Sequence, residues 1–276
     1  MKTLLTGNGQ TDAPQPTTTP GTNAQAVAGK LTELISALEH RRLDAGSPYN
    51  PEAWCRLLCT AGLQDKYPTI PHCLQFGFDA GIQLISHTVT PPNRPTIDEY
   101  STKFDELVQI KLQKGRYISP VSCEEVKSLL GAFQTSPFSI IEKPGQPGKY
   151  RLIQNPHSPI DSTTSINSSI NSDQYPCTWG TFATICLLIS RLPPGSQAAV
   201  RNIKEAYRTI PIQPDQWPGL IVRLHRDNKF AINTHNCFGL ASGGGVYGLV
   251  GDASAQIMCF HSIAPLSKWV DDHVFF

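Results

Sequence analysis

The sequence predicts an α+β fold of the split-βαβ kind. Two observations support this prediction. Apolar residues recur at helical spacing in the first half of the chain, whereas short apolar runs bounded by Gly and Pro dominate after Gly131. The second half then gives, in order, a hairpin, a helix, a strand, a second hairpin, a helix and a final hairpin.

Charge and cysteine content limit the possible classes of protein. The 276 residues carry a formal net charge of +1, so any groove for nucleic acid has to come from local placement of Lys and Arg. None of the eight cysteines forms a C-x-x-C pair, and the spacing of Cys55, Cys59, His72 and Cys73 fits no common zinc framework. We therefore expect reduced thiols.

The sequence shows no targeting or membrane-spanning segment. The apolar run Phe182–Ile189 is interrupted by Thr184 and is far too short to cross a bilayer, and Met1–Leu5 is too short for a secretory signal core. We expect an intracellular protein of the cytoplasm or nucleus that is not secreted and makes no membrane contact. Residues 1–25 are rich in Thr, Pro, Gly, Asn and Gln, so we expect a disordered tail.

A helical N-terminal region is predicted over residues 26–114. Apolar spacing predicts an amphipathic helix over residues 27–43. The pair Asn50-Pro51 is typical of an N-cap followed by Pro at the first helical position, and Gly62 ends that helix. Residues 63–95 are expected to be loops around a short strand or helix near residues 74–85.

Two capping boxes are predicted to begin the next two helices. Thr96 with Glu99, and Ser122 with Glu125, each fit the pattern in which the first side chain and the fourth cap each other's backbone. Gly115 is expected to close the first of these helices. One stripe of that helix carries Phe104, Leu107, Val108 and Lys111.

A basic hairpin is predicted after Gly131. Phe138–Ile141 and Tyr150–Gln154 form its strands, and residues 142–149, with two Pro and two Gly, form its turn. The basic side chains that it carries are Lys143, Lys149 and Arg151. Such side chains pair well with triphosphate oxygens, although a hairpin with ordinary surface lysines remains an alternative.

The following elements are predicted from period and turn residues. Helices are expected at residues 178–192 and 246–260, a strand at residues 198–203, and a hairpin at residues 220–233. The cluster Gly243–Gly245 is expected to let the backbone approach another segment closely.

Asp271 and Asp272 lie between apolar residues at the end of the chain, which predicts a hairpin with the pair at its turn. Two carboxylates this close repel each other, and a bound divalent cation relieves the repulsion. An ordinary surface turn is the alternative from these residues alone.

Four blocks together resemble the reverse transcriptases of retrotransposons, most closely fungal elements of the gypsy and tyrosine-recombinase-bearing types. Trp269–Asp272 resembles the Y-x-D-D box, and Asn202–Ile212 resembles the box D-x-x-x-A-[YF]-x-x-I-P-[LI]. Phe238–Leu240 with the small residues after it resembles the F-G-L box, and the basic hairpin resembles the fingers hairpin. All four occur in the family's order.

The resemblance implies fingers and palm of a right-hand polymerase over residues 115–276, with a ferredoxin-like palm sheet that has helices on one face. It implies an RNA-directed DNA polymerase that uses Mg²⁺ or Mn²⁺, an RNA or DNA template-primer and a dNTP, with room for further domains of a longer polyprotein. The implied metal ligands and catalytic residues are Asp271, Asp272 and the residue at position 202. The implied substrate contacts are Lys143 and Arg151 for the triphosphate, Tyr207 as the gate against a ribose 2′-hydroxyl, and Phe238 and Gly239 under the nucleotide.

Three departures from the family pattern bear on activity. Asn202 stands where the family has Asp, and a neutral amide oxygen binds Mg²⁺ weakly. Trp269 replaces a Tyr, and the resemblance stops just after the Asp pair, so we expect the thumb, RNase H and integrase parts to be absent. Two functions remain open, an impaired polymerase and a domain that binds nucleic acid or a partner without catalysis. An unrelated metal-binding α+β domain is a third possibility.

Overall fold

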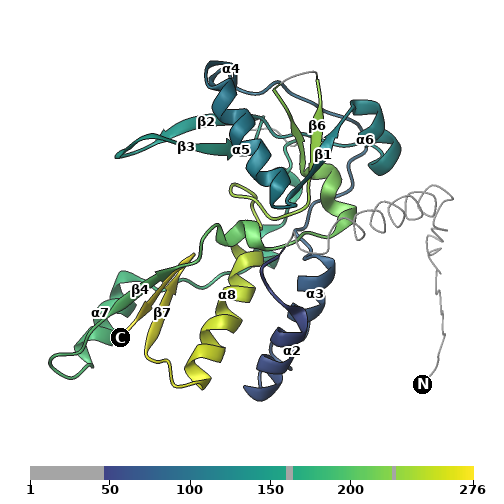
Figure 1. Cartoon of the computed structure of the whole chain (residues 1–276). Helices are drawn as coiled ribbons and strands as arrows, with labels where there is room; N and C mark the ends of the chain where they lie inside the picture. The colour runs from purple at the N-terminus through teal and green to yellow at the C-terminus, as the bar shows by residue number, and fades with distance from the viewer. Residues whose placement is uncertain (1–46, 160–163, 226–227) are drawn as a thin grey trace, which may run out of the picture.

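The computed structural model describes residues 47–159, 164–225 and 228–276. The tail predicted at residues 1–25 and the helix predicted at residues 27–43 lie outside the described residues. Figure 1 shows two lobes. The upper lobe contains α4, α5, α6, β1, β2, β3, β5 and β6, and the lower lobe contains α2, α3, α7, α8, β4, β7 and β8. The predicted mixture of helix and sheet is confirmed.

Two short helices begin the described part of the lower lobe. In α2 (Pro51–Thr60) the Asn50 side chain accepts a hydrogen bond from the backbone N–H of Ala53 at 2.8 Å, so the predicted N-cap is confirmed. Helix α3 (Ile70–Phe76) follows, and it settles the predicted choice between strand and helix for the beginning of residues 74–85.

The capping box predicted at Thr96 is wrong. Pro95 is the N-cap of α4 (Thr96–Glu99), and the Thr96 hydroxyl accepts a hydrogen bond from the backbone N–H of Ile140 at 3.2 Å instead. A contact with the neighbouring strand therefore takes the hydroxyl that the local pattern had assigned to the helix. A new helix, α5 (Ser101–Gln113), starts after Tyr100. In contrast, both bonds of the Ser122–Glu125 capping box are present at α6 (Cys123–Leu130).

A three-stranded antiparallel sheet lies in the upper lobe in the order β1-β6-β5. Strands β5 (Ile221–Arg223) and β6 (Phe230–Asn233) form the predicted hairpin. Strand β1 (Tyr117–Val121) was not predicted, and its register with β6 shifts between Ile118 and Val121.

The predicted basic hairpin is β2 (Phe138–Lys143) with β3 (Gln146–Gln154). Its strands are longer than predicted, because pairing continues to Lys143 opposite Gln146. The turn is consequently confined to the two residues between them.

The lower lobe holds a second three-stranded antiparallel sheet, in the order β4-β8-β7. Its strands are β4 (Ala199–Asn202), β7 (Leu266–Trp269) and β8 (Asp272–Phe275). All four residues of β4, which is an edge strand, are exposed. Helix α7 (Phe182–Ser190) has no buried residue, and it begins later than predicted because Thr181 caps it.

Helix α8 (Gly243–Phe260) includes the predicted glycine cluster in its first turn. A Cβ on Gly245 would lie 2.1 Å from the Tyr175 carbonyl oxygen, and one on Gly248 would lie 3.1 Å from Cys177 Cβ. Residues 175–177 are therefore the segment that the glycines allow to approach. Lys268 of β7 is buried, forms an ion pair with Asp252 of α8, and so ties the hairpin to the helix.

Within the described ranges, these elements are connected by four 3₁₀ helices: η1 (Asn167–Ser169), η2 (Ser172–Gln174), η3 (Ala206–Thr209) and η4 (Pro214–Gly219). One apolar core joins the two lobes, since it combines residues such as Leu58 and Tyr247 below with Phe133 and Ile232 above. All eight cysteines are free, as expected. Among the described helices, none has the length and apolar character needed to cross a membrane.

Candidate functional site

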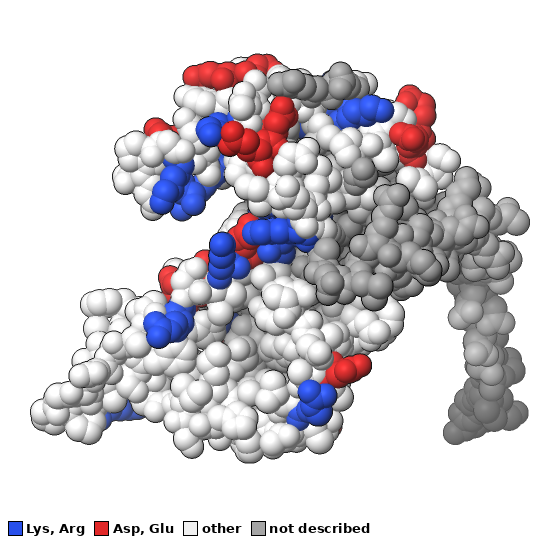
Figure 2. Space-filling model, viewed as in Figure 1, with Lys and Arg blue, Asp and Glu red and all other residues white. Residues whose placement is uncertain are grey.

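The surface is hollowed between the β2–β3 hairpin of the upper lobe and the β4–β8–β7 sheet of the lower lobe. Figure 2 shows this hollow in profile, with Lys and Arg side chains on both of its sides. Local placement of basic residues therefore brings positive charge to this hollow, which the net charge of +1 does not indicate.

The two Asp residues lie where β7 turns into β8, next to the end of β4. Asp272 is paired with Asn202 on one side and with Trp269 on the other. The Asn202 side-chain amide donates a hydrogen bond from Nδ2 to Asp272 Oδ1 at 3.1 Å, and the backbone N–H of Ile203 donates to the Asp271 carbonyl at 2.7 Å. Strand pairing thus holds Asn202 next to Asp271 and Asp272, which follow it by 69 and 70 positions in the sequence.

The turn that carries Asp271 is strained. Val270 has a φ of 51°, a left-handed conformation that a β-branched residue rarely adopts. Such a conformation costs about 1–3 kcal/mol and persists only where its surroundings enforce it. Strained backbone of this kind concentrates at functional sites, which supports a role for the turn beyond connecting two strands.

The oxygen atoms at this turn include the kind of ligand that binds a divalent cation. Two adjacent carboxylates are the hard, charged ligands that Mg²⁺ and Mn²⁺ prefer, but Asn202 adds only a neutral amide. In the described ranges, no group of three or more His, Cys, Asp or Glu side chains is placed to hold a metal ion. The donor set at this turn therefore consists of two carboxylates and one neutral amide oxygen.

Tyr207 and Phe238 form an aromatic pair near the turn. Their rings are stacked with centroids 4.6 Å apart and an interplanar angle of 27°, and Tyr247 contacts Tyr207 from α8 at 5.5 Å. Burial raises the pKa of Tyr207, and the charges of Cys177 and Asp271 add to the effect. The resemblance had assigned these two residues to one nucleotide site, and the fold does bring them together.

Gly239 links the aromatic pair to the upper lobe. Its φ is 94°, and a Cβ there would lie 3.0 Å from the carbonyl oxygen of Gln154, the last residue of β3. The Asn167 side chain donates to the Gly239 carbonyl at 2.8 Å and accepts from the Ala241 N–H at 2.9 Å. Asn167 therefore fixes the loop that carries Phe238, a role that the sequence did not indicate.

Lys143 and Arg151 lie on the β2–β3 hairpin, away from the Asp pair. Arg151 is exposed and is paired with Ile141 in the ladder, and Lys143 is paired with Gln146 near the hairpin tip. The hairpin overhangs the hollow in Figure 2. No ion pair joins either side chain to Asp271 or Asp272 in the described part of the chain, so the structure does not gather all predicted site residues into one contact cluster.

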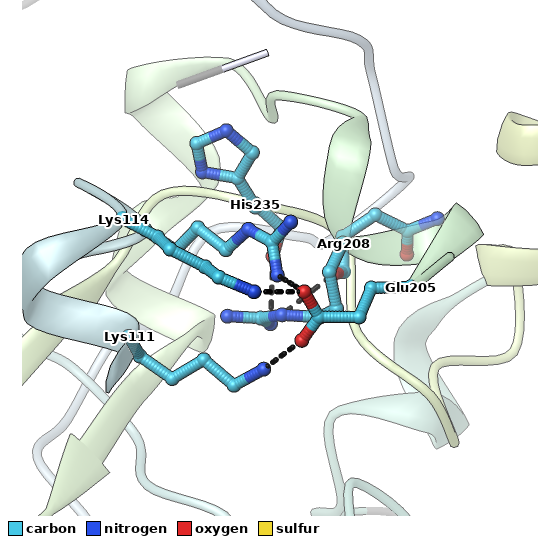
Figure 3. A network of polar contacts seen from close by, with 7 residues as sticks. Lys111, Lys114, Glu205, Arg208 and His235 are labelled. Carbon is cyan, nitrogen blue, oxygen red and sulfur yellow. Dashed lines mark hydrogen bonds and ion pairs between the residues drawn. The ribbon is translucent and has the colours of Figure 1, made fainter. Parts of the chain in front are cut away.

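A cluster of charges was missed by the sequence analysis. Glu205, three residues after Asn202, forms ion pairs with Lys111 Nζ at 2.7 Å, with Arg116 Nη1 at 2.8 Å and with Lys114 (Figure 3). The available signal was Lys111, a cation on the apolar stripe of α5.

Glu205 is not available as a further carboxylate ligand beside Asp271 and Asp272. Burial alone would raise the pKa of its carboxyl, but the hydrogen bonds and charges of Lys111, Lys114 and Arg116 outweigh burial and hold the pKa well below its usual value. The carboxylate oxygens of Glu205 are therefore occupied by ion pairs with three cations and are not free to bind a metal ion.

Comparisons with known proteins give a weak structural similarity. No protein-family model and no curated protein matches the chain. The crystal structure of prototype foamy virus protease-reverse transcriptase is similar with a TM-score of 0.48 and 12% identity, over 96% of this chain and 30% of that one. The foamy viral enzyme in complex with dsDNA has a TM-score of 0.44 and 12% identity, over 95% of this chain and 47% of that one.

A third structure, the foamy viral protease-reverse transcriptase in complex with an RNA/DNA hybrid, has a TM-score of 0.44 and 14% identity, over 96% of this chain and 30% of that one. The chain thus spans 30% to 47% of the length of these three structures. The similarity is to reverse transcriptases, but these values do not assign the chain to a family. None of them bears on the finer resemblance to fungal elements.

Proposed function

We propose that this chain is a reverse-transcriptase-like fingers-and-palm domain that binds a template-primer and a dNTP in the hollow between its lobes, with an impaired catalytic site. The observation that carries the proposal is the bond from Asn202 to Asp272. It shows that β4 and the β7–β8 turn bring the residues of two distant sequence blocks to one point. Tyr207 lies close enough to this turn for the charge of Asp271 to raise its pKa, and Figure 1 shows the basic hairpin above the sheet that carries the turn.

In this proposal Asp271 and Asp272, with the Asn202 amide oxygen, would hold Mg²⁺ or Mn²⁺. A bound divalent cation supplies activation of the primer 3′-hydroxyl and neutralisation of charge on the triphosphate. The metal site lacks one negative charge, so we propose that nucleotidyl transfer by the chain is slow or undetectable.

The remaining site residues bind and orient. Tyr207 and Phe238 offer a stacked aromatic surface to the sugar and base of the incoming nucleotide, since ring faces pack well against bases. Lys143 and Arg151 would hold the triphosphate from the hairpin, because charge-assisted bonds to phosphate are strong and a guanidinium binds two oxygens at once.

Binding without catalysis is the second candidate, and the Asn202–Asp272 bond itself favours it. In the family pattern a carboxylate stands at position 202, where it would repel Asp272. Here the amide donates to Asp272 and stabilises the pair without a metal. A site that is stable without a bound cation suits a domain that binds its ligands but no longer catalyses a reaction.

The test is primer extension on an RNA template with Mg²⁺ or Mn²⁺, run beside a binding assay with the same labelled template-primer. We expect binding by the chain, extension near background, and tighter metal binding in Asn202→Asp. Robust metal-dependent extension by the chain itself would overturn the impaired site, and a lack of template-primer binding would overturn both candidate functions.

A further inference from the structure

More positive than negative charge is gathered around Glu205. Lys111, Lys114 and Arg116 all form ion pairs with this one carboxylate, and Figure 3 shows those of Lys111 and Lys114. Arg208 adds a fourth cation. The pKa of Lys111 is lowered to about 8, first by burial and second by the charge of Arg208. One carboxylate cannot balance four cations that are partly removed from water, and such a cluster favours a further anion.

Two guanidinium groups in the cluster keep unused donors. Arg116 and Arg208 are each 6% exposed. Arg208 Nη1 donates to the carbonyl of Asn236 at 3.1 Å, while Arg208 Nε, Arg208 Nη2 and Arg116 Nε have no hydrogen-bond partner in the described structure. A buried donor without a partner is destabilising, so an added acceptor would be stabilising.

The cluster is partly exposed to solvent. The side chains of Lys114 and Glu205 are 38% and 25% exposed. Glu205 is also held in a left-handed backbone conformation with a φ of 57°, three residues after the end of β4 and just before η3. A ligand that released its carboxylate would therefore remove the ion pairs that help to hold this strained residue.

We propose that Lys111, Lys114 and Arg116 form a binding site for a phosphate group, for which the Glu205 carboxylate competes. A phosphate group offers more oxygens and more charge than a carboxylate, and a guanidinium pairs with two of these oxygens at once. The site is distinct from Lys143 and Arg151 on the hairpin.

Two sources of phosphate fit this position. Glu205 follows Asn202 and precedes Tyr207, so the site adjoins the proposed nucleotide site, and the ligand is either the polyphosphate of a nucleotide or the backbone of a bound strand. This choice of ligand rests on the proposed function, whereas the binding of phosphate itself does not.

Calorimetric titration in EDTA tests the site without metal or chemistry. One probe is inorganic pyrophosphate, and the other is a short single-stranded RNA without terminal phosphates. Glu205→Gln removes the competing charge and should tighten binding of the true ligand roughly tenfold, the effect of about one charge-assisted bond. Tightening with pyrophosphate alone indicates the polyphosphate, and tightening with the RNA indicates the strand backbone.

The matched control is Glu106→Gln, which removes an exposed carboxylate that pairs with Lys103 on the same helix. It changes the net charge equally and should leave both affinities unchanged. Adding Lys111→Gln to Glu205→Gln should abolish the gain. Should Glu205→Gln fail to fold, Lys114→Gln in the original chain should weaken binding of the same ligand roughly tenfold.

The proposal is overturned if Glu205→Gln folds and binds both probes no better than the original chain, or if Lys114→Gln leaves both affinities unchanged. A purely structural network would give these results together with a lower stability of Glu205→Gln. Template-primer binding by the original chain alongside such a result would leave the proposed function standing.

Discussion

Asn202→Asp tests whether the β7–β8 turn is a metal site that has lost one ligand. The substitution changes one atom, replacing the Nδ2 that donates to Asp272 Oδ1 at 3.1 Å with an acceptor oxygen. The two side chains then carry like charges on directly paired residues of β4 and β8. We expect the variant to be less stable than the original chain without metal, and more responsive to Mg²⁺.

The expected magnitude follows from two losses. A hydrogen bond to a charged acceptor contributes about 1.5–3 kcal/mol, and Asn202 is exposed, so its bond belongs at the lower end. Two unit charges roughly 4 Å apart in water repel by about 1 kcal/mol. The free energy of unfolding should therefore fall by about 2–3 kcal/mol in EDTA. Mg²⁺ at a hundred times its dissociation constant returns about 2.7 kcal/mol.

Urea unfolding in EDTA and in MgCl₂ measures both quantities, with Asn202→Ala as the matched control. The Ala variant loses the same donor and adds no charge, so it should lose only the hydrogen-bond contribution and should respond to Mg²⁺ no more than the original chain does. The reasoning is refuted if Asn202→Asp is as stable as Asn202→Ala in EDTA, or if Mg²⁺ stabilises it no more than it stabilises the original chain.

Three further variants have definite expected outcomes. Gly245→Ala should unfold α8 or prevent folding, because its Cβ would lie 2.1 Å from a backbone carbonyl oxygen. The control Gly244→Ala, whose Cβ would have no atom nearer than 3.5 Å, should be neutral or stabilising by up to about 1 kcal/mol. Thermal unfolding compares the two variants. Arg151→Ala should weaken dNTP binding by about 1.5–3 kcal/mol, and exposed Lys127→Ala should not, as measured by titration; equal affinities would show that the hairpin does not bind the nucleotide. Because the pKa of Glu205 lies below its ordinary 4.5, the ionised carboxylate stabilises the fold above pH 4.5, and this stabilisation is lost as the pH falls further. Below pH 4.5 the stability of Glu205→Gln should therefore drop less steeply than that of the original chain. Parallel acid unfolding curves of the two proteins would contradict this.

Local patterns predicted those elements whose partners are close in sequence. The Ser122 capping box and the Asn50 cap formed as expected, because each is completed within a few residues. The Thr96 box failed because a strand more than forty residues away offered its hydroxyl a different partner. Strand β1 was hidden by Pro120, which cannot donate to a ladder and interrupts the apolar alternation.

The site divides in the same way. Ordered sequence blocks predicted that Asn202 would lie beside the Asp pair, and strand pairing places it there. The partners of Glu205 could not be predicted, since Lys111 and Lys114 come from positions 94 and 91 residues earlier. Nothing in the local sequence shows which carboxylate a lysine on a helix will reach.

The exposed edge at β4 has a practical consequence for anyone who purifies this chain. No described strand pairs with its outer side, and Val200 on it is 56% exposed, while Phe182 on α7 is 84% exposed. An open edge next to apolar side chains is a template for indiscriminate aggregation. Solubility should therefore set the highest concentration at which binding can be measured. A charged residue in place of Val200 would raise that limit without changing the residues proposed to bind in the hollow.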